Sequence, residues 1–312
     1  MIAFVFPGQG SQFIGMGRKI AQEFPVAKDT FEEVDTALGF SLSSLIWEGD
    51  KEELQLTINA QPAIMVTSLA VVAALKAEGI DVSKSFCVAG HSLGEYSALC
   101  AAGSLSLSDT ARLLRKRGQY MQDSVSLGHG AMAAILGLDL QTVRKVIKNC
   151  SEYGVCEIAN DNDPNQVVIS GWKAAIEKAC EEAKSHGARR AIALPVSAPF
   201  HCSLMAPAQE KMAKMLAEVS IEEPLIPIIS NVTASSATDP DQIRKNLINQ
   251  ITGTVRWRES VIHMNSLGVQ RFLEVGPGKV LSNLIKRIIK EVDQYSVGEV
   301  EEIYAFKERY NV

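Results

Sequence analysis

A serine lies between two glycines in the sequence GHSLG, with Ser92 at its centre. The motif follows the apolar run of residues 85–90 and precedes a helix-like run that extends to Gly103. On a tight turn between a strand and a helix, a serine hydroxyl is exposed as a nucleophile, and the free N–H groups at the start of the helix can stabilise an oxyanion. Serine is also a common helix cap, so the motif alone is compatible with a catalytic or a structural Ser92.

A serine nucleophile needs a base, which is most often a histidine. Of the five histidines, His201 in the stretch PVSAPFHCSLM is the best candidate. It follows a strand-like run and a proline-containing bend, where active-site loops are common. His91 is next to Ser92 but should point away from it across the turn. The others are expected to be ordinary packed or surface histidines: His129 in a glycine-rich linker, His186 at the end of a polar helix, and His263 in a helix-like run.

Two glycine-containing loops, GQGSQFIG and GPGK, resemble parts of phosphate-binding loops. Neither has the complete spacing of a dinucleotide-binding motif or a P-loop, so both predict turns rather than nucleotide sites. The histidines form no metal-binding pair, and the six cysteines form no C-x-x-C pair. The sequence therefore predicts no metal and no cofactor.

The stretch RLLRKRGQ places four cations on one predicted helix. At about 100° per residue, Arg112, Arg115 and Lys116 share one arc, and Arg117 lies about 100° beyond Lys116. The shared arc is expected to be a solvated face. Arg117 is the cation that can turn inward.

The composition, 46% hydrophobic and 21% charged residues, is typical of a soluble globular protein. A formal net charge of -5 argues against nucleic acid or an anionic membrane as a partner. The apolar segment from Ala63 to Leu75 is too short to span a bilayer and predicts a buried helix with Pro62 near its first turn. Scattered cysteines and a start without a leader-like segment predict a cytoplasmic protein.

Short apolar runs alternate with helix-like runs at both ends of the chain. The strand candidates are residues 2–6, 85–90, 227–230 and 270–275. The last of these leads into residues 279–290, where apolar side chains recur at helical spacing. This alternation predicts an α/β fold with a mostly parallel sheet that is covered on both faces.

The middle of the chain has a different pattern. From about residue 131 to residue 196, the order is strand, helix, strand, strand, helix, strand, as in a ferredoxin-like unit. The flanking segments are rich in small residues, glycine or proline, and suit linkers. We therefore expect a large domain formed by residues 1–125 and 198–312, with residues 126–197 inserted as a small domain.

Six stretches together resemble malonyl-CoA:acyl carrier protein transacylases, over nearly the whole chain and in the order of that family. They are FVFPGQGSQFIGMG, GHSLGEYSAL, RGQYMQ, PVSAPFHCSLM, NQITGTVRW and FLEVGPGKVLSNL. The resemblance implies an α/β-hydrolase-like large domain with a ferredoxin-like insert. It also implies an acyltransferase that moves a malonyl group from coenzyme A to the phosphopantetheine thiol of acyl carrier protein, through a seryl ester, for fatty acid synthesis.

The resemblance assigns roles to the matching residues. Ser92 would attack the thioester, and His201 would take and return the proton. Arg117 would pair with the malonyl carboxylate, a task that suits the planar fork of a guanidinium. The remaining implied roles belong to the backbone N–H groups of Gln9 and Leu93, as the oxyanion hole, and to a main-chain carbonyl near Gln250, which would orient the histidine.

Two other classes of protein share part of this pattern. A thioesterase or esterase of the α/β type would also use Ser92, but its histidine would come late in the chain, where His263 is the only candidate. A carrier-protein-binding subunit without catalytic activity would not need Ser92, His201 and Arg117 together.

A carrier protein is acidic and this chain is itself net negative, so docking requires a local basic patch. The adjacent Arg189 and Arg190, on the last strand of the small unit, are the first candidates. Lys286 and Arg287, on the C-terminal helical run, are the second. The alternative interpretation of both pairs is ordinary solvated cations.

Overall fold

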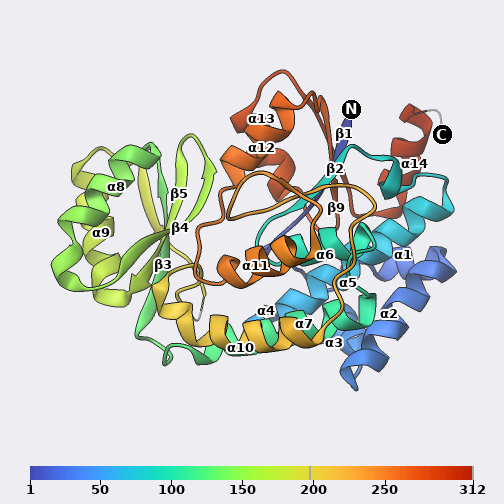
Figure 1. The fold of residues 1–312 in the computed structure, drawn as a ribbon, viewed down its shortest axis with the longest axis horizontal. Helices are drawn as coiled ribbons and strands as arrows, with labels where there is room; N and C mark the ends of the chain where they lie inside the picture. The colour runs from blue at the N-terminus through green and yellow to red at the C-terminus, as the bar shows by residue number, and fades with distance from the viewer. Residues whose placement is uncertain (197, 311–312) are drawn as a thin grey trace.

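A computed structural model describes residues 1–196 and 198–310, in which two sheets are surrounded by helices (Figure 1). The larger sheet has the order β10-β9-β1-β2-β7-β8. Its strands from β10 to β7 are parallel, and only β8 runs antiparallel to its neighbour. The α/β fold with a parallel sheet is thus confirmed. The strands are β1 (Ile2–Phe6), β2 (Cys87–Gly90), β7 (Ile228–Ile229), β8 (Ser236–Ala237), β9 (Arg271–Val275) and β10 (Asp293–Val297).

Most helices belong to this larger unit. They are α1 (Arg18–Glu23), α2 (Pro25–Leu38), α3 (Leu42–Glu48), α4 (Lys51–Gln55), α5 (Thr57–Ala77), α6 (Gly94–Ala101), α7 (Leu107–Asp123), α10 (Ala206–Glu218), α11 (Pro240–Gln250), α12 (Trp257–Ser266), α13 (Val280–Ile288) and α14 (Val300–Tyr310), with 3-10 turns at Val82–Lys84 and Ser203–Met205.

The central strands are buried on both faces, as the sequence predicts. In β1, Phe4 and Phe6 pack into the main core with α5, α6 and α7. The intervening Ala3 and Val5 face a second core, to which α12 and α13 contribute. Because successive side chains of a strand point to opposite faces, this alternation fixes which helices cover each side of the sheet.

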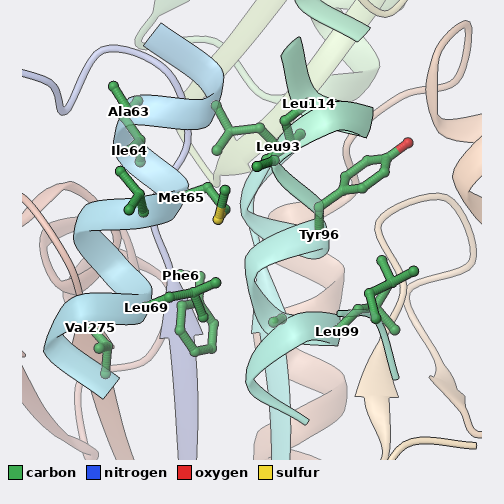
Figure 2. Close-up of a cluster of buried hydrophobic side chains, with 14 of the residues drawn as sticks. Phe6, Ala63, Ile64, Met65, Leu69, Leu93, Tyr96, Leu99, Leu114 and Val275 are labelled. Atoms are coloured by element: carbon green, nitrogen blue, oxygen red, sulfur yellow. The ribbon is translucent and has the colours of Figure 1, made fainter. Parts of the chain in front are cut away.

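Helix α5 runs through the main core, and Figure 2 shows its side chains packed toward β1 and α6. It is long and apolar enough to cross a membrane, but 83% of its apolar window is buried inside the protein, as in the core helix of a globular fold. The helix begins at Thr57, so Pro62 lies more than one turn inside it and not near its first turn. The expected start of the helix was wrong because its first turn carries polar side chains, including that of Asn59, that are buried. Hydropathy does not identify such a turn as part of a buried helix.

The second sheet has four antiparallel strands in the order β4-β5-β3-β6. Helices α8 and α9 form an apolar core with one face of it, and Met132 and Val168 on the other face join the main core. Figure 1 shows this unit on the left of the molecule. Its elements are β3 (Gly130–Leu136), α8 (Leu140–Asn149), a 3-10 turn (Ser151–Tyr153), β4 (Cys156–Asp163), β5 (Gln166–Trp172), α9 (Lys173–Ser185) and β6 (Arg190–Ala193).

Polar contacts at the end of β4 join the two units. Arg258 donates two hydrogen bonds from Nε and one from Nη2 to the carboxylate of Asp161, and Arg287 Nε lies 2.6 Å from Asp163 Oδ2. Both aspartate side chains are almost fully buried. A buried carboxylate is costly without such partners, so these pairs fix how the small sheet lies beside the active-site edge of the larger one.

The C-terminal segment has more structure than the sequence indicated. The sequence of the last twenty or so residues, with Glu299, Glu301 and Glu302, predicts an exposed closing segment, but β10 extends the large sheet and α14 packs against it. Ile303 and Phe306 of α14 are buried. The expectation was wrong because β10, DQYSV, is a half-buried edge strand with polar residues, which has no apolar run to reveal it.

Candidate active site

Ser92 lies on a sharp turn between the end of β2 and the start of α6. Its φ of 54° is in the left-handed region, which non-glycine residues rarely adopt. The two flanking glycines are sterically required. A Cβ on Gly90 would lie 1.9 Å from the carbonyl carbon of Gly94, and a Cβ on Gly94 would lie 2.2 Å from the oxygen of Phe6. The GHSLG motif therefore forms the strand–turn–helix geometry of an exposed nucleophile.

Ser92 and His201 are in direct contact although they are far apart in the sequence. Ser92 Oγ lies 2.7 Å from His201 Nε2, and His201 Nδ1 lies 2.8 Å from the main-chain oxygen of Gln250. A carbonyl oxygen can only accept, so Nδ1 carries the proton and Nε2 is left as an acceptor for the serine hydroxyl. This tautomer is the one that a general base requires.

The pKa of His201 is lowered to about 3. The main cause is burial, which disfavours the charged imidazolium, and the second is the nearby positive charge of Arg117. The histidine is only 4% exposed and is held in a left-handed backbone conformation, with a φ of 57°. It is therefore neutral, and able to accept a proton, over the whole physiological pH range.

Arg117 turns inward from α7 and is 1% exposed. Its Nη1 donates to Gln61 Oε1 at 2.8 Å, and its Nη2 donates to Gln250 Oε1 at 2.8 Å and to Ser92 Oγ at 3.1 Å. Its Nε has no partner, and among residues 1–196 and 198–310 no carboxylate forms an ion pair with it. Burial lowers the pKa of the guanidinium. A buried cation held only by neutral acceptors is poised to bind an anion.

A cavity of about 320 Å³ brings these groups together. Five of the six predicted site residues line it: Gln9, Ser92, Leu93, Arg117 and His201. The sixth, Gln250, is fully buried behind them. In the part of the chain that the structure describes, nothing accepts a hydrogen bond from the backbone N–H of Gln9 or Leu93, so both remain free to donate.

Three residues at the site were given no role by the sequence analysis, namely Gln61, Glu95 and Asn231, although Glu95 lies within the stretch GHSLGEYSAL. Asn231 lies two residues after the end of β7. The carboxyl end of a parallel strand is where α/β sites gather, so this position is the signal that could have identified it. Glu95 is one turn after Ser92 and 2% exposed, and burial raises its pKa to about 7.

The other histidines are not in contact with the Ser92 hydroxyl. His91 points away from it, as expected, with Nε2 2.8 Å from Asn162 Oδ1 and the ring close to that of Trp257. Burial lowers the pKa of His91. His263 lies on α12, His186 is the C-cap of α9, and His129 precedes β3. Within the described ranges, no three His, Cys, Asp or Glu side chains are grouped as a metal site.

The four docking candidates all lie outside the cavity and are exposed. Arg189 and Arg190 lie at the start of β6, and neither forms an ion pair with any described residue. Lys286 and Arg287 lie in the last turn of α13, but Arg287 is already committed to Asp163. Only the first pair therefore presents two adjacent cations without an acidic partner.

Comparison with known proteins gives a consistent result. Residues 3–303 match the acyl transferase domain family. The chain is 48% identical over 303 residues to the malonyl CoA-acyl carrier protein transacylase of Bacillus subtilis (strain 168), covering 97% of this chain and 95% of that one. The acyl-carrier-protein-S-malonyltransferase of Bartonella henselae superposes with a TM-score of 0.97 at 49% identity, covering 100% and 99%. A malonyl-transacylase solved in complex with its type II PKS acyl-carrier protein is 39% identical, with a TM-score of 0.95 and 99% coverage of both chains.

Proposed function

The chain belongs to the acyl transferase domain family, and from this premise we propose that Ser92 carries the malonyl group during its transfer from coenzyme A to acyl carrier protein. The observation that carries the proposal is the 2.7 Å contact between Ser92 Oγ and His201 Nε2. It occurs beside Arg117, a buried cation that lacks a carboxylate partner among the described residues. In fatty acid synthesis, this activity supplies the thioester between the malonyl group and acyl carrier protein.

In the first half-reaction, Ser92 Oγ attacks the thioester carbonyl while His201 Nε2 takes the hydroxyl proton. The carbonyl oxygen becomes an oxyanion, for which the free N–H groups of Gln9 and Leu93 are the available donors. The carbon–sulfur bond then breaks, and the leaving thiol receives the proton from His201. The second half-reaction repeats these steps in reverse with the phosphopantetheine thiol as nucleophile, which gives ping-pong kinetics.

Arg117 provides the preference for malonyl over acetyl in this proposal. The two acyl groups differ by one carboxylate, and a guanidinium can bind that group through two charge-assisted hydrogen bonds. Its Nη2 is 3.1 Å from Ser92 Oγ, so a carboxylate bound there is close to the ester bond that forms. Three neutral acceptors already hold the guanidinium in place, which reduces the cost of ordering it on binding.

We also infer that the chain has two domains. Residues 1–125 and 198–312 form the large domain, and residues 126–197 form a ferredoxin-like domain inserted into it. Ser197 lies outside the described residues. The order β4-β5-β3-β6, antiparallel throughout and with both helices on one face, supports this assignment. An α/β-hydrolase-like large domain is supported by the turn at Ser92 between a parallel strand and a helix.

For the carrier protein, we infer docking near Arg189 and Arg190, whose charges have no acidic partner among the described residues. A cytoplasmic location is also proposed, and the six free cysteines support it.

Intact mass spectrometry tests the reaction. On mixing with malonyl-CoA, the protein is expected to gain one malonyl group, which peptide mapping assigns to Ser92, and to lose it when holo acyl carrier protein is added. Acetyl-CoA and methylmalonyl-CoA, tested separately, measure the selectivity. Ser92→Ala should form no adduct, since loss of a serine nucleophile can cost up to about 10⁶-fold in turnover. An undiminished adduct on Ser92→Ala would exclude the proposed nucleophile. Release of free malonate without carrier protein would indicate a thioesterase.

A further inference from the structure

The side chain of Asn231 spans the turn that carries the nucleophile. Its Oδ1 accepts a hydrogen bond from the backbone N–H of Ser92 at 2.7 Å, and its Nδ2 donates to the oxygen of Gly90 at 2.6 Å. One amide therefore binds the peptide groups on both sides of His91. Asn231 is fully buried and follows β7, the strand that pairs with β2, so it reaches the turn from a neighbouring strand of the sheet.

Glu95 holds Asn231 in turn. Its Oε2 accepts from the backbone N–H of Asn231 at 3.1 Å and from Gln250 Nε2 at 2.6 Å. The same Nε2 donates to the backbone oxygen of Ser92 at 3.0 Å. Both the N–H and the C=O of Ser92 are thus bound by buried amide side chains. One carboxylate, that of Glu95, holds the amide of Gln250 and the backbone of Asn231.

This network acts on a strained conformation. Ser92 has a φ of 54°, which costs energy for a residue with a Cβ and persists only where the surroundings impose it. The hydrogen bond from Asn231 also occupies the N–H of Ser92. The next N–H along the chain, that of Leu93, forms no hydrogen bond with any described residue and stays free.

We propose that Asn231, anchored by Glu95, is a positioning residue that holds the Ser92 turn in its reactive conformation and determines that Leu93, not Ser92, offers its N–H to the oxyanion. This inference rests on the proposed role of Ser92 as the nucleophile. Asn231 does not line the cavity, so it acts through the backbone of Ser92 without contact to the acyl group.

The main test is Asn231→Leu, which keeps the side-chain size and removes both hydrogen bonds. The matched control is Asn246→Leu on α11, which removes another buried amide, one that accepts a hydrogen bond from Gln242 away from the turn. With malonyl-CoA, Asn231→Leu should slow esterification of Ser92 by about 10- to 100-fold, because two buried polar groups of the turn lose their partner. The KM for malonyl-CoA should stay within about threefold, because Arg117 keeps its contacts. The control should match the unsubstituted protein.

Unchanged esterification by Asn231→Leu would overturn the inference, as would an equal loss in the control or a raised KM with an unchanged maximal rate. Absence of a Ser92 ester in the unsubstituted protein would instead remove the proposed function itself, so the two failures are distinguishable.

If Asn231→Leu does not fold, Asn231→Asp decides the question. Burial and the neighbouring Glu95 raise the pKa of a carboxyl group at this position. At about pH 8 it has no proton to donate to Gly90, whereas at about pH 5.5 it is protonated and can donate. Its rate relative to the unsubstituted protein should rise at least about fivefold between these values, while Arg117 stays charged and His201, with a pKa of about 3, stays neutral. Because the introduced carboxyl group and Glu95 are neighbours, they titrate as a pair, and the ratio to the unsubstituted protein reports the protonation of that pair. A ratio that does not change with pH would overturn the inference.

Discussion

Replacing Arg117 by alanine should invert the preference of the enzyme between malonyl and acetyl groups. Arg117 is 1% exposed, and its guanidinium is held by the side chains of Gln61, Gln250 and Ser92. These partners are neutral, so they fix its position while no carboxylate of the described residues forms an ion pair with it; Glu95 acts on its charge only at longer range. In Arg117→Ala the cavity keeps its serine and its histidine but loses the group that binds the malonyl carboxylate.

The size of the effect follows from the burial of this site. When Arg117 is absent, a carboxylate that enters the cavity loses its hydration and gains no ion pair with a cation. Truncating one partner of such a buried pair costs about 2–5 kcal/mol, which corresponds to a loss of about 30- to 5,000-fold in kcat/KM for malonyl-CoA. Acetyl-CoA brings no carboxylate, so its kcat/KM should change by no more than a few-fold.

The assay is the transfer of each acyl group to holo acyl carrier protein, compared as kcat/KM. Arg115→Ala is the matched control, because Arg115 lies on the same helix and contacts Asn59 and the ring of Phe40 outside the catalytic cavity. Arg115→Ala should change kcat/KM for malonyl-CoA and for acetyl-CoA by no more than a few-fold. Equal losses for malonyl and acetyl in Arg117→Ala would mean that Arg117 supports the fold or binds coenzyme A, and the carboxylate would have to be bound elsewhere.

Two further predictions concern pH and docking. Because the pKa of His201 is lowered to about 3, its neutral form persists as pH falls, so esterification of Ser92 should be retained well below the ordinary histidine pKa of about 6.5. Rates measured from about pH 8 to pH 4.5 check this, and a half-loss near pH 6.5 would contradict it. Exchanging Arg189 and Arg190 for glutamate should raise the KM for carrier protein and leave the KM for malonyl-CoA unchanged. The same exchange at Lys145 and Lys148 on α8 is the control and should change neither KM. Equal effects on the two KM values in the arginine variant would argue against docking at Arg189 and Arg190.

The large parallel sheet could be predicted because its central strands are short apolar runs between helices. The order of elements from about residue 131 to residue 196 could also be predicted, and the structure has it as β3, α8, β4, β5, α9 and β6. The edge strand β10 could not be found in this way, because its half-buried residues follow no apolar run. The first turn of α5 was missed for a similar reason, since its polar side chains, including that of Asn59, are buried although hydropathy predicts that polar residues are exposed.

The site shows the same division between local and long-range information. The turn at Ser92 is local, so its glycine spacing indicates the geometry directly. The contact of Ser92 with His201 spans 109 residues, and no periodicity relates the two. The proline-containing bend before His201 made it the best candidate among the histidines, and the resemblance to a family then assigned the pair. Asn231 is 139 residues from Ser92, and no motif contains it. Long-range polar contacts of this kind depend on which strands become neighbours, which a single sequence does not specify.

The lowered pKa of His201 connects the selectivity of the enzyme with its chemistry. In the free enzyme the charge of Arg117 is the second cause of that shift, after burial. A malonyl carboxylate bound to Arg117 compensates this charge, so the imidazolium that forms during the attack of Ser92 becomes less unfavourable. An acetyl group binds without this compensation and leaves His201 a weaker base. In the proposed mechanism, the carboxylate of malonyl therefore contributes twice, first by binding to Arg117 and then by strengthening His201 as the base that activates Ser92. The second contribution appears in kcat and not only in KM, because it acts in the transition state.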